Sequence, residues 1–179
     1  MSAFTHLDGE GHARMVDVTA KVPTVRNAVA EGFVECAPHV VAALRDGSVP
    51  KGDVLAVARI AGIAGAKRTA DLLPLAHVIG VHGVVVDLEV TDEGVAIRAR
   101  VSTADRTGVE MEALTAVSVA ALNVIDMVKG LDKGTSVRDV RLVAKDGGKS
   151  GSWRREMDEG REMDEGREMD ERRQAGAAS

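Results

Sequence analysis

The sequence predicts an α+β fold, in which helices are grouped apart from an antiparallel sheet. Residues 84–90 and 95–101 are predicted strands, and the T-D-E-G turn between them indicates a β-hairpin. Residues 106–130 form one long predicted helix, and residues 137–143 (V-R-D-V-R-L-V) are predicted to return as a last strand.

The part of the chain before the hairpin predicts one short strand and two helices. Residues 14–18 (R-M-V-D-V) alternate as a strand does, and a first helix is expected over about 26–46, with Gly47 as its stop. A V-P-K-G-D turn opens a second helix over about 53–73, which Pro74 ends. Small residues on this second helix would allow another helix to pack closely: Ala58, Gly62, Gly65 and Ala66.

The long helix has an uncharged middle, residues 113–125, which belongs inside a protein or between subunits. Glu110 and Glu112 lie near its start, where the helix dipole favours carboxylates. Asp126 and Lys129, near its end, are three residues apart and share a face. Such groups are also ordinary complements of the dipole, and an Asp/Lys pair at this spacing is commonly a solvated ion pair. A functional role therefore needs support beyond spacing.

The two ends of this helix are too far apart to flank one reacting centre. Glu112 and Asp126 are separated by roughly 21 Å along a helix that rises ~1.5 Å per residue, although they face directions only roughly 40° apart. An antiparallel copy related by a two-fold axis would bring the Glu112 end of one chain beside the Asp126 end of the other. Residues 113–125 would then supply the apolar contact. Alternatively, the apolar run packs inside one subunit and the two ends serve different parts of a long substrate.

Composition argues against several classes of protein. The chain has 179 residues, enough for one domain with a core, and only 2% are aromatic, so aliphatic side chains must fill that core. A net charge of −5 without a basic block argues against a nucleic-acid partner. Cys36 is the only cysteine, the N-terminus shows no signal peptide, and the longest uncharged run is too short to span a bilayer. We therefore expect a cytoplasmic protein without a membrane segment.

Residues 152–179 differ from the rest of the chain. The sequence R-E-M-D-E-G occurs at 155–160 and 161–166 and begins again at 167. Its period fits no helical repeat, and so charged a segment buries too little apolar surface to offset its ordering entropy. We predict a single α+β domain over 1–151, followed by a tail that is disordered or transiently helical.

Four further features could carry chemistry, and each also has an ordinary structural explanation. Lys51 lies in a turn before a helix, Lys67 and Arg68 lie in an otherwise apolar helix from which they can snorkel to solvent, and His77 follows in a loop. The run at 147–151 (G-G-K-S-G) lacks the first glycine of a Walker phosphate loop, so an ATPase is rejected. The histidines show no zinc-binding spacing, and no metal site is expected.

Four blocks, in order, carry a resemblance to a known family. They read M-V-D-V-T-A-K, then K-G-D-V-L-A-V-A-R-I-A-G-I-A-G-A-K-R-T-A-D-L-L-P-L, then T-G-V-E-M-E-A-L-T-A-V-S-V-A-A-L-N-V-I-D-M-V-K, and finally D-V-R-L-V-A-K-D-G-G-K-S-G. Over about residues 4–151 the chain resembles the cyclic pyranopterin monophosphate synthase family of molybdenum cofactor biosynthesis.

The resemblance implies a lyase that converts 3',8-cyclo-7,8-dihydroguanosine 5'-triphosphate to cyclic pyranopterin monophosphate and diphosphate, without a cofactor. It implies a ferredoxin-like fold with helices packed on one face of the sheet. It also implies a homohexamer, a trimer of dimers with active sites between subunits. The catalytic residues that it implies are Asp126, Lys129 and Lys51. The implied substrate-binding residues are Leu75, Ala76, His77, Glu110, Met111, Glu112, Arg26 and Lys67.

One departure lies in the loop after the second helix. The family commonly has Cys-His-Pro where this chain has Ala76-His77-Val78, and loss of the proline leaves the backbone after His77 freer.

An alternative function is that of a non-catalytic paralogue, which binds a purine triphosphate as a regulator or assembly partner. Retention of Lys51, Asp126 and Lys129 favours the enzyme, because proton transfer and triphosphate binding need such groups.

Overall fold

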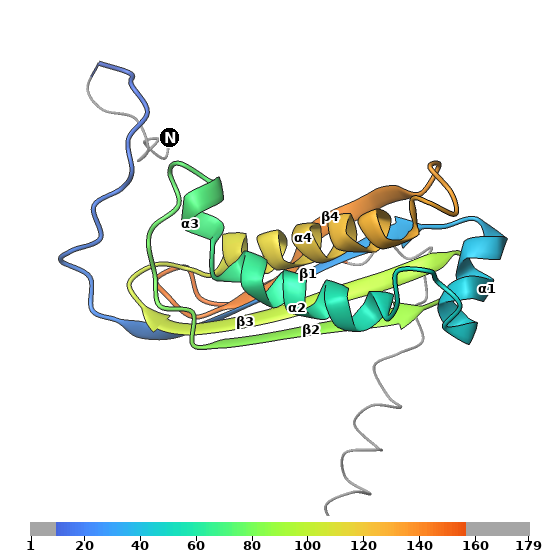
Figure 1. Cartoon of the computed structure of the whole chain (residues 1–179). Coiled ribbons are helices and arrows are strands. Elements are labelled where there is room, and N and C mark those ends of the chain that lie inside the picture. The colour runs from blue at the N-terminus through green and yellow to red at the C-terminus, as the bar shows by residue number, and fades with distance from the viewer. Residues whose placement is uncertain (1–9, 157–179) are drawn as a thin grey trace, which may run out of the picture.

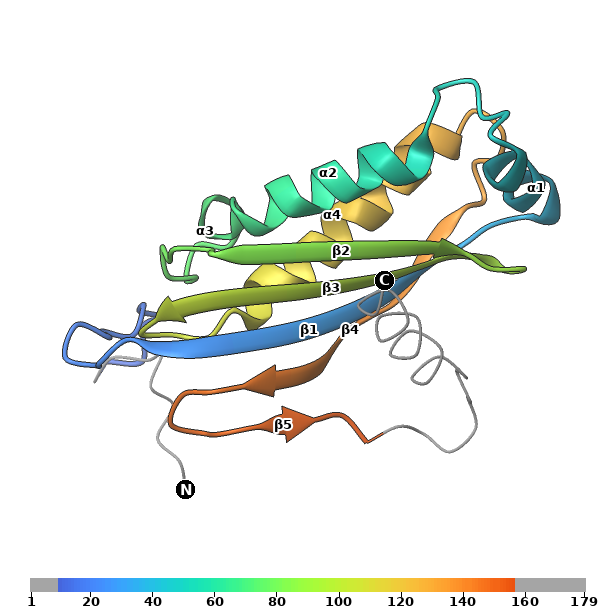
Figure 2. The ribbon, with the colours of Figure 1, turned by 90° about the horizontal axis from the view of Figure 1, so that it is seen from below.

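A computed structural model describes residues 10–156, and residues 1–9 and 157–179 lie outside the described part. The described chain forms a five-stranded antiparallel sheet with the strand order β2-β3-β1-β4-β5. The long helices pack on one face of that sheet (Figure 1, and Figure 2 from below). The elements in chain order are β1 (Thr24–Glu35), α1 (Pro38–Asp46), α2 (Val54–Ala66), α3 (Thr69–Leu72), β2 (Gly83–Val90), β3 (Gly94–Asp105), α4 (Glu110–Val128), β4 (Ser136–Asp146) and β5 (Trp153–Arg154).

The four long strands and the two long helices follow one another as β1-α2-β2-β3-α4-β4, and the four strands lie in the order β2-β3-β1-β4. This βαββαβ sequence is that of the ferredoxin-like fold. Both α2 and α4 lie over the same face of the sheet (Figure 2). The predicted fold is therefore confirmed.

The central strand β1 occupies residues for which a helix was predicted, so the expected helix over 26–46 is wrong in its first half. Alternate residues of β1, among them Ala30 and Val34, are fully buried, which is the two-residue period of a strand. Pairing with β3 on one side and β4 on the other overrides the local preference of this segment for a helix. The helix starts only at Pro38 and stops at Gly47 (φ 72°), the predicted stop.

The second predicted helix is two helices. Its start is confirmed by Asp53, whose carboxylate accepts a hydrogen bond from the Ala56 N–H at 2.9 Å and caps α2. The single helix expected over 53–73 is wrong beyond Ala66. There the Thr69 hydroxyl donates to the Ala66 carbonyl at 3.1 Å, so a side chain takes a bond that the helical backbone would have made. One separate turn, α3, follows.

Residues 14–18 form no strand, although their alternation predicted one. They run outside the sheet and have no strand partner among the described residues. Val16 and Val18 are half-buried and the other three residues are exposed. Alternation alone therefore identified an extended segment but not a strand, because a strand also needs a neighbour to accept its backbone hydrogen bonds.

The predicted hairpin, the long helix and the last long strand are all confirmed, as β2–β3, α4 and β4. The hairpin turn closes through the Thr91 N–H, which donates to the Gly94 carbonyl at 2.8 Å. Gly94 has φ 148°, and a side chain there would meet the Val34 carbonyl of the neighbouring strand. Only glycine fits this turn.

Helices α2 and α4 pack together through the predicted small residues. Ala58, Gly62, Gly65 and Ala66 are all buried. A Cβ atom added to Gly62 would lie 2.9 Å from the Ala116 carbonyl oxygen, and one added to Gly65 would lie 2.8 Å from a Val119 methyl group. The backbone of α2 thus lies against α4 at a distance that larger side chains would prevent.

The apolar character of α4 is explained by its place in the core. With 19 residues it is long and apolar enough to cross a bilayer by length and composition, and half of it is buried in this domain. Its buried residues include most of the uncharged run 113–125, and they face the sheet and α2. This helix is the core element of the domain.

The short strand β5 extends the sheet beyond β4 by pairing Trp153 and Arg154 with Lys145 and Ala144. It lies inside the segment 152–179, which the sequence placed outside the domain, so the sheet extends to Arg154, three residues beyond the predicted boundary at 151. The rest of the predicted disordered tail, 157–179, lies outside the described residues.

We predict that Gly62→Val lowers the free energy of unfolding by about 1–3 kcal/mol, because the new side chain meets the backbone carbonyl of Ala116 and α2 cannot stay in place. Chemical denaturation of the purified protein measures this change. Ala64→Val is the matched control, since Ala64 is exposed on the same helix. Equal unfolding curves for the two variants would show that the helices have room to move apart.

Candidate active site

Lys51, Asp126 and Lys129 form one cluster at the end of α4. The Lys51 ammonium donates to Asp126 Oδ2 at 2.9 Å, and the Lys129 ammonium donates to Asp126 Oδ1 at 2.6 Å. All three side chains are about half exposed, at 45%, 53% and 57% in chain order. The structure thus brings together the three residues that the sequence proposed as catalytic.

The position of Lys51 follows from the end of α4. Asp126 lies in the last turn of that helix, where the backbone carbonyls have lost their intrahelical partners. The Lys51 ammonium donates to the Asp126 carbonyl at 2.6 Å and so satisfies one of these groups. Lys51 itself lies in the turn closed by the Gly52 N–H and the Val49 carbonyl, just before α2. Packing of α2 on α4 therefore carries Lys51 to the negative end of the α4 dipole.

The charges around Asp126 keep its side chain in the ionised, carboxylate form. The hydrogen bond from Lys129, followed by that from Lys51, lowers the pKa of Asp126 to about 2. Two ammonium groups share this one carboxylate, so the cluster carries a net charge of +1. It can therefore bind an anionic group and donate protons, while Asp126 holds the two donors in place.

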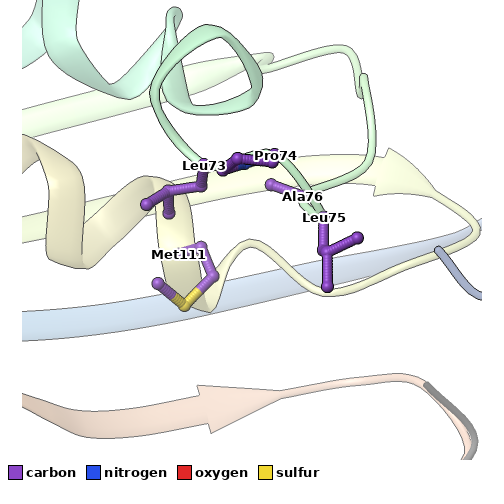
Figure 3. A pocket seen from close by; sticks show the side chains of 5 residues that line it. All are labelled: Leu73, Pro74, Leu75, Ala76 and Met111. Atoms are coloured by element: carbon purple, nitrogen blue, oxygen red, sulfur yellow. The ribbon is translucent and has the colours of Figure 1, made fainter. Parts of the chain in front are cut away.

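A second group of predicted residues lies at the other end of α4. Leu75, Ala76 and Met111 line an open, apolar cavity of about 530 Å³ together with two residues that the sequence did not single out, Leu73 and Pro74 (Figure 3). Met111 comes from the first turn of α4, and the others come from the chain after α3. The sequence marks Pro74 only as the end of a helix, and its place beside Leu75 is the signal that could have identified it as a lining residue.

His77, Lys67 and Glu112 line a smaller neighbouring cavity of about 90 Å³. Glu112 is only 4% exposed, and burial raises its pKa, with Glu110 adding to the rise and His77 opposing it. His77 Nε2 lies 2.6 Å from the backbone carbonyl oxygen of Val16, a contact that the sequence did not predict. These residues form a polar pocket beside the apolar cavity.

Arg26 and Glu110 lie at the same end of the molecule but line neither of these two cavities. The Arg26 guanidinium donates to the carbonyls of Asp105 and Arg106, at 3.0 and 3.1 Å, and lies against Gly148. Glu110 is the first residue of α4, and its carboxylate lies against Gly108. The predicted site residues thus fall into two groups at opposite ends of α4, and one chain does not bring them together.

The fold and the cluster define a class of protein, an α+β domain with two exposed ammonium groups around one carboxylate at the end of α4. The MoaC family model matches residues 15–148, and the chain belongs to the MoaC family. The match ends before the hexapeptide repeats of the C-terminal segment. Within residues 10–156 no three His, Cys, Asp or Glu side chains are grouped as metal ligands would be.

Relatives from several bacteria are similar over most of this chain, and each is named cyclic pyranopterin monophosphate synthase. The protein of Streptomyces coelicolor is 63% identical over 152 residues, which cover 85% of this chain and 89% of the relative. That of Thermomicrobium roseum is 53% identical over 163 residues, 90% of this chain and 98% of the relative. That of Geobacter sulfurreducens is 50% identical over 157 residues, with coverages of 86% and 98%.

We predict that Lys129→Met raises the pKa of Asp126 from about 2 toward its usual 3.8, because the hydrogen bond from Lys129, the largest cause of the lowered pKa, is removed. Since the folded pKa lies below the unfolded one, the stability that these ion pairs contribute is complete above about pH 4 and is lost as pH falls through 2. A carbon-13 NMR titration of the carboxyl group measures the shift.

The matched control for this titration is Lys133→Met, which removes an exposed lysine from the loop after α4. We expect it to leave the Asp126 pKa at about 2. Equal titration midpoints in the two variants would contradict the assignment of the shift to the Lys129 hydrogen bond.

Proposed function

We propose that this protein is a cyclic pyranopterin monophosphate synthase, which converts 3',8-cyclo-7,8-dihydroguanosine 5'-triphosphate to cyclic pyranopterin monophosphate and diphosphate in molybdenum cofactor biosynthesis. Membership of the MoaC family and the common name of the relatives support this function. The observation that carries it in the structure is the hydrogen-bonded cluster of Lys51, Asp126 and Lys129.

The cluster suits the two parts of this reaction. Opening and reclosing the rings requires proton transfers, which Lys51 and Lys129 can supply from about half-exposed ammonium groups. Expulsion of diphosphate from the α-phosphorus builds negative charge that the same groups stabilise. Asp126 remains ionised and orients both ammonium groups, since its pKa of about 2 is far below neutral pH.

The residues at the other end of α4 suit the binding of the substrate. Leu75, Ala76 and Met111 offer an apolar cavity to a flat ring, and the adjoining pocket offers polar groups to its edge. Arg26 and Lys67 supply positive charge for phosphate groups. The polar groups that we assign to substrate binding in this pocket and at its rim are His77, Glu110 and Glu112.

The alternative of a non-catalytic paralogue is less well supported. Such a protein would need to bind the triphosphate but would have no use for a preserved proton-donating cluster. Lys51, Asp126 and Lys129 are all present and hydrogen-bonded to one another, and the named relatives are all synthases.

Given the cyclic dihydroguanosine triphosphate, the purified protein should release diphosphate and form the pterin product. Lys51→Ala, Asp126→Ala and Lys129→Ala should each abolish this turnover while leaving the circular dichroism spectrum unchanged, because these side chains are about half exposed and outside the core. Lys133→Ala is the matched control and should keep full activity. Near-normal activity in any of the three variants would remove that residue from the mechanism.

We further propose that each active site is shared by two chains of a cytoplasmic homohexamer built as a trimer of dimers. The Asp126 cluster and the Glu112 pocket lie at opposite ends of the same 19-residue helix, roughly 21 Å apart. One substrate molecule cannot contact both ends of one helix at a single reacting centre. Two antiparallel copies of α4 related by a two-fold axis would join the two half-sites.

The outer face of the helix layer suits such a contact. Most of the uncharged run 113–125 packs inside its own chain, so the contact must come from residues that point outward. Val57 and Ile60 on α2 are 41% and 68% exposed, and Leu122 on α4 is 61% exposed. Large exposed apolar side chains on neighbouring helices mark a protein interface, and a second copy of this chain would bury them.

Subunit mixing tests the shared site. Glu112→Ala protein and Asp126→Ala protein should each be inactive, and activity should return when the two are mixed under conditions that exchange subunits. A mixed dimer contains one site with both intact residues. Continued inactivity in mixed oligomers verified by mass spectrometry, with both parents folded, would mean that each chain builds its site alone.

A further inference from the structure

The chain before β1, residues 10–23, contributes no residue to the hydrophobic core. The buried core residues of the described chain begin at Ala28. In this arm only Val16 and Val18 are even half-buried. Its long-range hydrogen bonds to the described domain include one from Arg106 Nε to the Lys21 carbonyl at 3.0 Å and one between His77 Nε2 and the Val16 carbonyl at 2.6 Å. These contacts of the arm therefore lie near the substrate-binding end and not in the core.

The contact with His77 has a chemical consequence. A carbonyl oxygen can only accept, so His77 Nε2 must carry a proton to make this bond. In the neutral imidazole the other nitrogen, Nδ1, is then an acceptor. No hydrogen bond from a described residue reaches Nδ1, and His77 lines the small cavity that also contains Glu112 and Lys67.

We propose that residues 14–18, the strap, position His77 for the substrate: the Val16 carbonyl holds the imidazole as its Nε2–H tautomer, so that Nδ1 accepts a hydrogen bond from an N–H group of the bound ring. The reduced, guanine-derived ring of the proposed substrate is rich in N–H donors. Without the strap, the two tautomers would exchange and the ring could rotate. Part of the population with Nδ1 as acceptor, and the fixed direction of that acceptor, would then be lost.

This inference rests on the proposed function for the identity of the ligand. The tautomer of His77 can be tested independently of that function. Nitrogen-15 NMR of histidine-labelled full-length protein reads the tautomer without any substrate. The His77 signals are assigned by their loss in His77→Gln. We expect a protonated Nε2 and an unprotonated Nδ1 at neutral to mildly alkaline pH, and signals averaged between tautomers would overturn the proposal.

A pair of variants tests the role of the strap. Val16→Gly removes a half-buried side chain and frees the backbone that carries the carbonyl, whereas Val22→Gly makes the same change in the same arm at a side chain that is 78% exposed. Val16→Gly should bring tautomer averaging and a fall in kcat/KM of roughly fivefold to tenfold, mainly through KM, as expected for one lost hydrogen bond. Val22→Gly should leave both unchanged.

The outcomes separate the two proposals. A fixed Nε2–H tautomer that Val16→Gly releases supports the strap even in a protein that fails to turn over the cyclic triphosphate, and that failure would count against the proposed function alone. Full activity together with an unchanged tautomer in Val16→Gly would overturn the strap and leave the function standing. Equal losses in Val16→Gly and Val22→Gly would also overturn it, since they would report a general effect of loosening the arm.

Discussion

The close packing of α2 against α4 is the contact on which the rest of the molecule depends. At Gly62 and Gly65 the two helices approach until a Cβ atom would lie 2.9 Å or less from its neighbour. This contact aligns the start of α2 with the end of α4 and places the Lys51 ammonium on the last carbonyls of α4. At the opposite end, the chain that leaves α2 closes the small pocket over Glu112. One apolar contact thus shapes both halves of the site.

Sequence reasoning predicted those parts of the fold that depend on local pattern. The β2–β3 hairpin, α4 and β4 follow from turn residues and periodicity, and Asp126 and Lys129 share a helix face by spacing alone. Strand β1 could not be predicted in this way. Its run of Ala, Glu and Val residues is compatible with a helix, and pairing with β3 and β4, both distant in sequence, decides the outcome. Lys51 joined the site only through the family resemblance, because its partner lies 75 residues away.

Contacts made by the backbone escaped sequence reasoning for a different reason. The bond between Val16 and His77 joins a carbonyl, which every residue has, to a side chain 61 positions away. No residue type signals such a contact. Residues 14–18 were therefore predicted as a strand from their alternation, and their structure shows instead a segment whose long-range hydrogen bond to a described residue is made to one imidazole.

The two carboxyl groups at the ends of α4 have opposite environments, and their pKa values are shifted in opposite directions. Asp126 is exposed between two ammonium groups that lower its pKa to about 2, so it stays charged and holds its partners. Burial raises the pKa of Glu112, so this group takes up a proton at a higher pH than an ordinary glutamate does. In the proposed two-chain site they meet across the substrate: Glu112 of one chain binds the ring, while Asp126 of the other keeps two ammonium groups directed at the phosphates.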